Sequence, residues 1–300
     1  MATAKKKPVT KKKAPAKKEA ALPTNVVRPY PNLDAMQPRN LLVHLAAHPK
    51  QGKSTYAMSV LSHCPAEDII AFEVEPGGLF APLRQQHCRA WLLRQGVTAA
   101  ALAAMPAQIL ACLTLEEFEQ SLDYYVFAPA KANPEGNIPP YRVVVIDSLS
   151  ELSDLIVERV SPSTYIGDRG RKAPLQGWGL IKEWWDSLLL RLRRLDDTIV
   201  ITTSHLVDKE ASPLYQKSDQ PGTEMETLIV PSIAGSTCYS IMRKAGAFFE
   251  LERKGTGKGA TYTLWTDQRN RLFAGSRLDV NLTEKDIALG ALLARNGYLD

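Results

Sequence analysis

The sequence lacks an apolar segment long enough to cross a membrane, for which a helix needs roughly 18 or more consecutive apolar residues. The nearest approach is the Ala-rich stretch 97–113, which Thr98, Pro106 and Gln108 interrupt. The amino end also lacks the apolar core of a secretory signal and the Arg- and Ser-rich amphipathic pattern of a transit peptide. We therefore expect a cytoplasmic protein with no membrane partner.

Cysteine is also scarce, which bears on metal and redox sites. The four cysteines (64, 88, 112 and 238) form no C-x-x-C pair. The dipeptides His63-Cys64 and His87-Cys88 offer four metal-ligand types, but adjacent residues rarely face one ion and no second short-spaced pair supports a site. We expect structural thiols of a reducing compartment.

A net positive charge is absent outside the amino end. The net charge of +5 arises because eight lysines and one glutamate fall within residues 1–20, while residues 21–300 hold 29 basic and 31 acidic side chains. Such a Lys-rich, Pro-containing segment repels itself and has little to bury, so residues 1–37 are predicted to be a disordered tail and lead-in. The tail either keeps the protein soluble or attracts nucleic acid electrostatically.

The rest of the chain alternates compact apolar runs with helical patterns, which is typical of an α/β protein with a mostly parallel sheet flanked by helices. A C-terminal β-hairpin is predicted at 247–253 and 260–266. We expect one domain over 38–280, followed by a C-terminal helix in 281–300 that Thr283 caps. The remaining predicted strands are 41–47, 68–75, 142–147 and 198–205, and the predicted helices are 52–62, 85–113 with a break at Pro106, 114–125, a helix from 148, 178–195 and 234–244.

The stretch AAHPKQGKST, 46–55, follows the first predicted strand and matches the phosphate-binding pattern G-x-x-x-x-G-K-[ST] in part. Such a loop directs backbone N–H groups at phosphates, while the lysine reaches the same oxygens and the hydroxyl binds Mg²⁺. Ala47 replaces the first glycine, a change that the turn tolerates if the φ angle of this residue is negative. The predicted nucleotide-binding residues are His48, Pro49, Lys50, Gln51, Gly52, Lys53, Ser54 and Thr55.

Three more polar residues end predicted strands, where open α/β sheets bind ligands. Asp147 closes VVVID and is either a metal ligand, together with Ser54, or a helix-capping residue. Ser148 follows it where many ATPases have a catalytic carboxylate, so that group must come from elsewhere. Glu75 is the candidate and Glu73 the alternative. His205, after TIVITTS, is a candidate sensor of the terminal phosphate.

In this order, LLVHLAAHPKQGKST, AFEVEPGG, VVVIDSLSEL and TIVITTSH resemble the loop, glutamate strand, metal-aspartate strand and sensor strand of RecA-type P-loop ATPases. The resemblance is greatest to short phage-encoded members implicated in single-strand annealing and recombination, and it covers about residues 38–280. It implies ATP and Mg²⁺ as cofactors, with Lys53, Glu75 and His205 as catalytic residues. It also implies a homo-oligomer, ring or filament, in which Arg277, or else Arg271, reaches the nucleotide of a neighbour.

The same resemblance implies binding of single-stranded DNA through loops at 161–177 and 206–228, in the bacterial host cytoplasm, with a single-strand DNA-binding protein as a further partner. Only the first loop is clearly basic, with Arg169, Arg171 and Lys172 as the candidate DNA contacts. Two other functions stay open. One is a nucleotide-binding scaffold with little turnover, and the other is a P-loop kinase, for which the sequence shows no acceptor pocket or arginine-rich lid.

Overall fold

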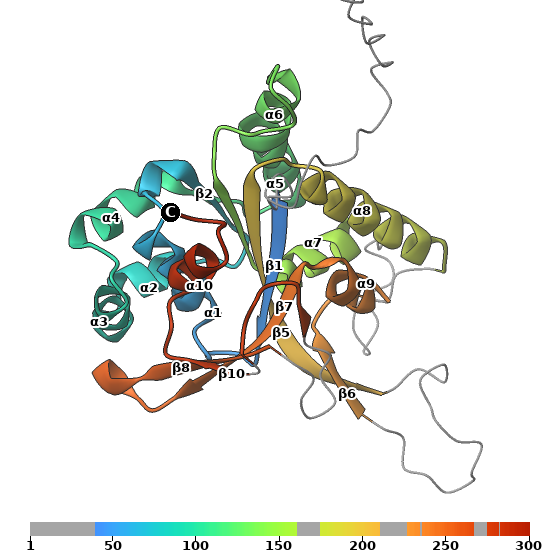
Figure 1. Cartoon of the computed structure of the whole chain (residues 1–300). Coiled ribbons are helices and arrows are strands. Elements are labelled where there is room, and N and C mark those ends of the chain that lie inside the picture. Colours follow the sequence, from blue (N-terminus) through green and yellow to red (C-terminus); the bar gives the residue numbers. More distant parts are fainter. Residues whose placement is uncertain (1–39, 161–174, 211–226, 235, 267–274, 282) are drawn as a thin grey trace, which may run out of the picture. The chain divides into compact units, whose positions relative to one another are not determined.

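A mostly parallel sheet forms the centre of the computed structural model (Figure 1), which describes residues 40–160, 175–210, 227–234, 236–266, 275–281 and 283–300. Within these residues the sheet has ten strands, in the order β10-β8-β7-β1-β5-β4-β2-β3, with β6 paired to β5 and β9 to β7. From β7 to β3 every neighbouring pair is parallel. The strands are β1 (Asn40–Ala47), β2 (Ile69–Glu73), β3 (Ile109–Ala111), β4 (Val143–Asp147), β5 (Thr198–Glu210), β6 (Thr227–Pro231), β7 (Ala247–Lys254), β8 (Thr261–Trp265), β9 (Gly275–Ser276) and β10 (Thr283–Lys285).

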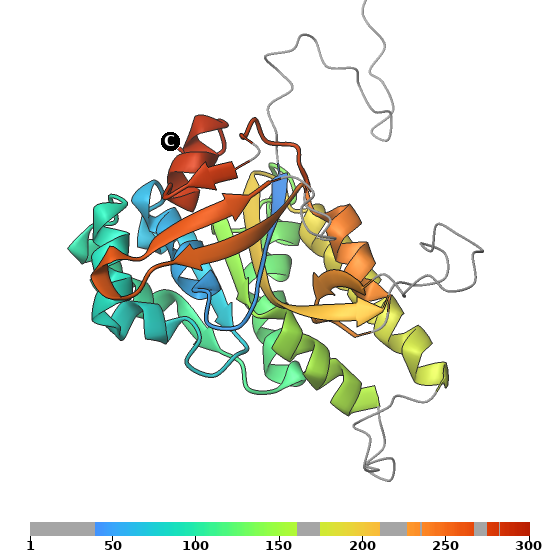
Figure 2. The ribbon, with the colours of Figure 1, turned by 90° about the horizontal axis from the view of Figure 1, so that it is seen from below.

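Helices cover both faces of the sheet, as Figures 1 and 2 show. The α-helices are α1 (Lys53–Met58), α2 (Phe80–Arg84), α3 (Gln86–Arg94), α4 (Ala99–Ala104), α5 (Leu115–Leu122), α6 (Ala128–Ala132), α7 (Leu149–Val160), α8 (Leu175–Arg193), α9 (Thr237–Lys244) and α10 (Leu289–Arg295). Short 3₁₀ or π turns extend several of them, including η1 (Ser59–Ser62), η2 (Ala66–Asp68), η3 (Met105–Gln108), η4 (Asp123–Phe127) and η7 (Gly257–Gly259).

The central strands are apolar on both faces because each face is covered. All five residues of β4 are buried, and successive residues contribute to two separate apolar clusters. One cluster joins the sheet to α1, α3, α4 and α10 around Trp91, and the other joins it to α5, α7, α8 and α9 around Trp185. The core therefore consists of two layers separated by the sheet.

The predicted fold class is confirmed: the sheet is mostly parallel, helices flank it, and β7 and β8 form the antiparallel hairpin. The helix predicted from Thr114 is also confirmed, with both hydrogen bonds of its capping box to Glu117. Because β2 ends at Glu73, Glu75 lies in the turn after the strand rather than at its last position.

Three predicted elements differ from the structure. The helical stretch 85–113 ends in a short edge strand, β3, which pairs with β2. The predicted loop 128–140 begins with helix α6. The last helix does not start after Thr283, because residues Thr283–Lys285 pair with β8 as β10 and the helix begins at Leu289. Its first N–H groups face η1, where the Leu289 N–H donates to Ser59 Oγ at 2.8 Å.

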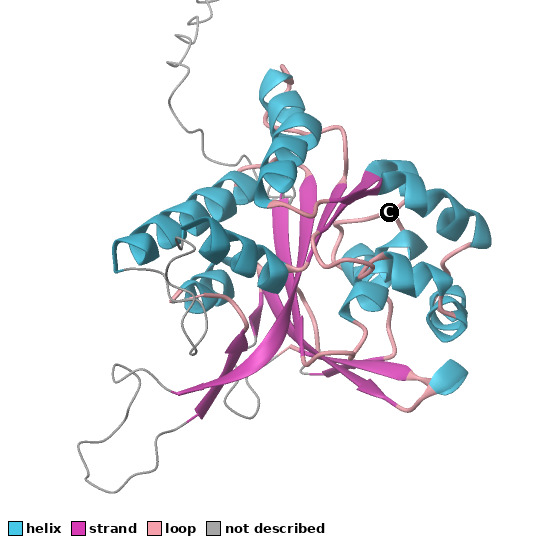
Figure 3. Cartoon of the chain, turned by 180° about the vertical axis from the view of Figure 1, so that it is seen from behind, coloured by secondary structure: helices cyan, strands magenta, loops and turns pink. Residues whose placement is uncertain are grey.

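Strand β5 continues past the core and pairs with β6 as a two-stranded ribbon, visible from behind in Figure 3. Residues at both ends of the predicted loop 206–228 therefore belong to strands β5 and β6. The last residues of the predicted loop 161–177 belong to helix α8. The tail 1–37 and four basic residues of the sequence predictions lie outside the described residues: Arg169, Arg171, Lys172 and Arg271. Among the described helices, none combines the length and apolarity needed to span a bilayer.

Candidate functional site

The loop 48–52 leaves β1 at the edge of the sheet where the central parallel strands end. Ala47 is the fully buried last residue of β1 and keeps a negative φ, so its methyl group causes no backbone strain. The positive φ angles of the loop fall on Lys50 (64°) and Gly52 (83°). A Cβ on Gly52 would stand 2.5 Å from the Tyr262 hydroxyl, so this position accepts only glycine. The position in this loop that requires glycine is therefore Gly52, directly before α1.

Lys53, His205 and Glu75 form a chain of contacts at this edge. Lys53 Nζ lies 2.9 Å from His205 Nδ1, and His205 Nε2 lies 3.5 Å from Glu75 Oε2. Because an ammonium only donates, Nδ1 accepts, which leaves the ring proton on Nε2 toward Glu75. Burial of Lys53 lowers the pKa of its ammonium, while the charges of Asp147 and Glu75 act in the opposite direction. The pKa of Glu75 is lowered, chiefly by its hydrogen bond from His205.

Asp147 is completely buried beside this chain of contacts and is held by two hydroxyl groups. Ser54 Oγ donates to Oδ2 at 2.6 Å, and Thr203 Oγ1 donates to Oδ1. Burial raises the pKa of Asp147, whereas the bonds from Ser54 and Thr203 lower it. The turn after β2 also closes over this carboxylate, since a Cβ on Gly78 would lie 3.0 Å from Asp147 Oδ2. The strand orients Asp147 toward α1 and does not use its carboxylate to cap α7.

The oxygen atoms of Ser54 and Asp147 fit the preference of Mg²⁺, which proteins hold through one or two side chains and substrate phosphates. The described residues contain no cluster of three or more His, Cys, Asp or Glu side chains that could form an all-protein metal site. This excludes, within those residues, a site built from the two His-Cys dipeptides. All four cysteines are buried, and none of them forms a disulfide.

The two candidate carboxylates of the β2 region have different surroundings. Glu73 is buried, and its Oε1 accepts the N–H groups of Leu79 (2.7 Å) and Phe80 (3.2 Å) at the start of α2. Glu75 is partly exposed, contacts His205, and its N–H donates to the Asp147 carbonyl at 3.2 Å. Of the two, Glu75 is the carboxylate that lies at the site.

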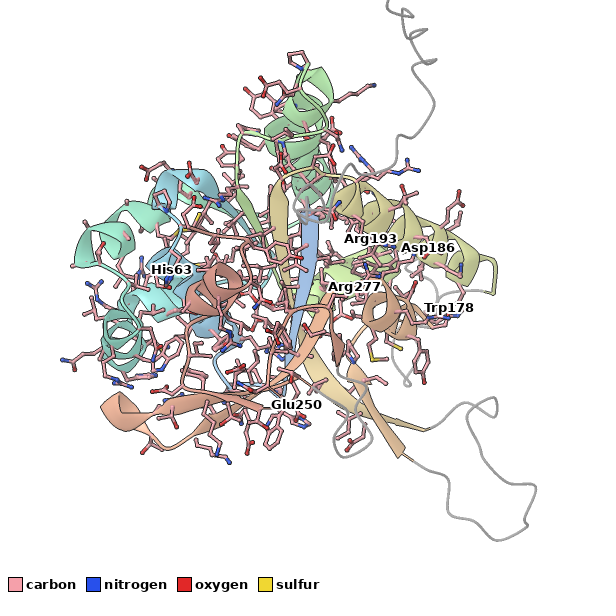
Figure 4. All side chains as sticks on the ribbon, viewed as in Figure 1. His63, Trp178, Asp186, Arg193, Glu250 and Arg277 are labelled. Atoms are coloured by element: carbon pink, nitrogen blue, oxygen red, sulfur yellow. The ribbon has the colours of Figure 1, made fainter. Side chains whose placement is uncertain are left out.

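Arg277 lies away from these groups. Its N–H donates to the Gly246 carbonyl at 2.8 Å, and the Gly246 N–H in turn donates to Leu42 near the start of β1. Its exposed side chain is therefore at the amino end of β7, whereas Glu250 lies further along the strand (Figure 4). Any contact of Arg277 with a nucleotide at loop 48–55 would have to involve a second copy of the chain.

Two supporting residues were missed in the sequence. Thr203 binds Asp147, and Ser150 Oγ accepts the His205 N–H at 2.9 Å. Both belong to short polar runs at strand ends, TTSH and DSLS. The polarity of these runs is the feature of the sequence that could have identified them. The Ser232 N–H also donates to the His205 carbonyl at 2.7 Å, which fixes the backbone of His205 on both sides.

Comparison with known proteins identifies the family. The family described as AAA domain (AAA_24) matches residues 39–278. No curated protein matches the chain. Among solved structures, the RadB recombinase is similar at 13% identity and a TM-score of 0.39, covering 77% of this chain and 82% of that chain. A KaiC-like protein, PH0186 of Pyrococcus horikoshii OT3, is similar at 13% identity and a TM-score of 0.36, covering 76% and 78%. The chain belongs to the AAA-domain family, and its mostly parallel sheet is flanked by helices.

Proposed function

We propose that this protein binds ATP with Mg²⁺ at loop 48–55 and hydrolyses it, and that it acts on single-stranded DNA. The observation that supports this most is the convergence of Lys53, Ser54, Glu75, Asp147 and His205 at one edge of the sheet. These residues come from α1, β4, β5 and the turn after β2, and they supply the charges that phosphoryl transfer requires.

Each residue has a distinct role in this proposal. Lys53 binds phosphate oxygens as a point charge, and the loop N–H groups at the start of α1 bind others. Ser54 and Asp147 would hold Mg²⁺, which neutralises phosphate charge when bound. Glu75 orients the attacking water and accepts its proton. His205 lies between Lys53 and Glu75, where it contacts the terminal phosphate and senses its loss.

The DNA and assembly parts of the proposal rest on the sequence resemblance to phage-encoded RecA-like ATPases. They include a role in phage recombination, annealing or replication, DNA contacts at Arg169, Arg171 and Lys172, and a ring or filament with Arg277 at a neighbour's nucleotide. A single-strand DNA-binding protein is a further proposed partner. The structure adds one supporting detail: β5 runs from His205 directly into the β5–β6 ribbon. A change at His205 on hydrolysis would therefore act on the strand that leads to the second proposed DNA loop.

The test is phosphate release from ATP with and without single-stranded DNA. We expect release that rises on addition of DNA and that Lys53→Ala lowers by about 100-fold or more, the scale for losing one transition-state contact. Lys131→Ala, which removes an exposed lysine on α6, is the matched control and should behave as wild type. ATP binding without phosphate release under any DNA condition would favour the scaffold function. Absence of ATP binding would refute the proposal.

A further inference from the structure

The β7–β8 hairpin forms one wall of the phosphate loop. Gln51 Oε1 accepts the backbone N–H of Arg253 on β7 at 2.8 Å. Tyr262 on β8 lies over Gly52, and its hydroxyl forms a hydrogen bond with Thr55, just after the loop. The hairpin is itself held to α3, since Arg94 donates to the Ala260 carbonyl at 3.0 Å and the Trp91 and Tyr262 rings lie 4.4 Å apart. Figure 2 shows the hairpin (orange) alongside α3.

Arg253 and Tyr262 are directly opposite each other in the antiparallel ladder. Side chains of directly opposite residues project from the same face of a sheet with their Cβ atoms about 5 Å apart. The face that carries Tyr262 against Gly52 therefore also carries Arg253. Burial raises the pKa of Tyr262, and the positive charge of Arg253 acts against that rise, which agrees with a guanidinium near the hydroxyl.

The Arg253 side chain is incompletely satisfied at this position. Its Nε is buried without a hydrogen-bond partner among the described residues, and Arg253 forms no ion pair with them. A buried donor without a partner is destabilising, so an unpaired one in a native fold calls for an explanation. An anion at the adjacent loop would supply the acceptor.

Strand β1 has β5 on one side and β7 on the other, so the phosphate loop that follows β1 has different neighbours on its two sides. Glu75, Asp147 and His205 lie on the side of β5, β4 and β2, whereas the hairpin lies on the other side, next to β1 through β7. A triphosphate whose reacting end faces Glu75 extends its nucleoside end toward the hairpin. We propose that Arg253 binds the α-phosphate of the nucleotide held by the loop of the same chain. This inference rests on the proposed nucleotide-binding function of loop 48–55.

Arg253→Met tests this contact, because methionine keeps the apolar stem and removes the charge. The variant should bind ADP and a non-hydrolysable ATP analogue about 10- to 100-fold more weakly, the range for losing a charged hydrogen bond. Both ligands should lose affinity equally, since both carry the α-phosphate. The thermal midpoint should not fall, because the buried Nε that the substitution removes has no partner among the described residues. Arg253→Lys, which keeps the charge, should recover part of the affinity.

Lys254→Ala is the matched control. Lys254 is the next residue on β7, so its side chain projects from the opposite face, where it is 60% exposed and 3.9 Å from Glu252. Binding of both ligands by titration calorimetry should be unchanged in this variant. Wild-type affinity in Arg253→Met, or a loss confined to the ATP analogue, would overturn the α-phosphate contact. Failure of Arg253→Met to fold would also overturn it by showing a structural role. Failure of the wild-type protein to bind either ligand would instead refute the proposed function.

Discussion

His44 makes the stability of the protein depend on pH in a way that the structure predicts. It lies in the middle of β1 and is fully buried. Its Nδ1 lies 2.8 Å from Thr202 Oγ1, its Nε2 lies 2.9 Å from Ser204 Oγ, and its ring stacks on Phe248 at 5.1 Å. Burial lowers the pKa of His44 from 6.5 to about 3. The folded protein therefore keeps this imidazole neutral in a range where the unfolded chain protonates it.

The sign and size of the effect follow from proton linkage. Above pH 6.5 both states are neutral and the full stability is present. As the pH falls toward 3, the unfolded chain binds one more proton than the folded protein, so the free energy of unfolding decreases by about 1.4 kcal/mol per pH unit. Between pH 7 and pH 4 the loss is about 3 kcal/mol, a large part of the roughly 5–15 kcal/mol that stabilises a typical domain.

The assay compares urea unfolding of wild type and His44→Gln at pH 7, 6, 5 and 4, followed by tryptophan fluorescence. Glutamine offers a donor and an acceptor to Thr202 and Ser204 but does not titrate. All other titrating groups are common to both proteins, so the difference in their free energies of unfolding isolates His44. We expect the wild type to lose about 3 kcal/mol more than the variant between pH 7 and pH 4. Parallel pH profiles would refute the reasoning.

Four further substitutions test the roles assigned to the β2 region and to the phosphate loop. Glu73→Ala should lower the free energy of unfolding by about 1–3 kcal/mol in urea titrations, since the N–H groups of Leu79 and Phe80 lose their acceptor. Glu75→Gln should instead abolish phosphate release at unchanged stability, and the reverse pattern would exchange the two roles. Gly52→Ala should weaken ADP binding in calorimetry, because a φ of 83° and the Tyr262 hydroxyl both oppose a side chain; wild-type affinity would contradict this. Ala47→Gly should leave phosphate release unchanged and cost about 0.5–1 kcal/mol of stability in a strand, so faster release would show that the missing glycine limits turnover.

The parts of the fold that the sequence predicts are those where local pattern and tertiary environment agree. The run VVVID is apolar throughout because β4 is buried on both faces, and the alternation of strands and helices leads to the parallel sheet. The element β3 was missed because three residues after an Ala-rich helix carry no periodicity of their own. The sequence from Thr283 is typical of a helix start, but its backbone pairs with β8 instead. Local helix propensity does not include such a long-range pairing.

The convergence of residues at the candidate site could be predicted for a similar reason. Parallel strands end at a common edge, so polar residues at their ends converge there whatever their separation in the chain. That rule brought Asp147 and His205 to Lys53, and with them Glu75. It could not identify Arg253 or Tyr262, because both lie within a hairpin, about 200 positions from the loop that they contact. Tyr262 lies against Gly52, and only the register of β7 against β8 places Arg253 opposite it.

The hairpin also explains why the incomplete loop pattern does not remove the geometry of a phosphate site. The residue in place of the first glycine, Ala47, is still part of β1, where its Cα pairs with His205 and a methyl group is accommodated. The chain turns later, at Lys50 and Gly52, and this turn is held from outside by Tyr262 and by the hydrogen bond between Gln51 and Arg253. A loop supported by a neighbouring hairpin needs less flexibility of its own. The turn after Ala47 is therefore held by contacts with the carboxyl-terminal part of the chain at Gln51 and Gly52, and its geometry does not require a glycine at position 47.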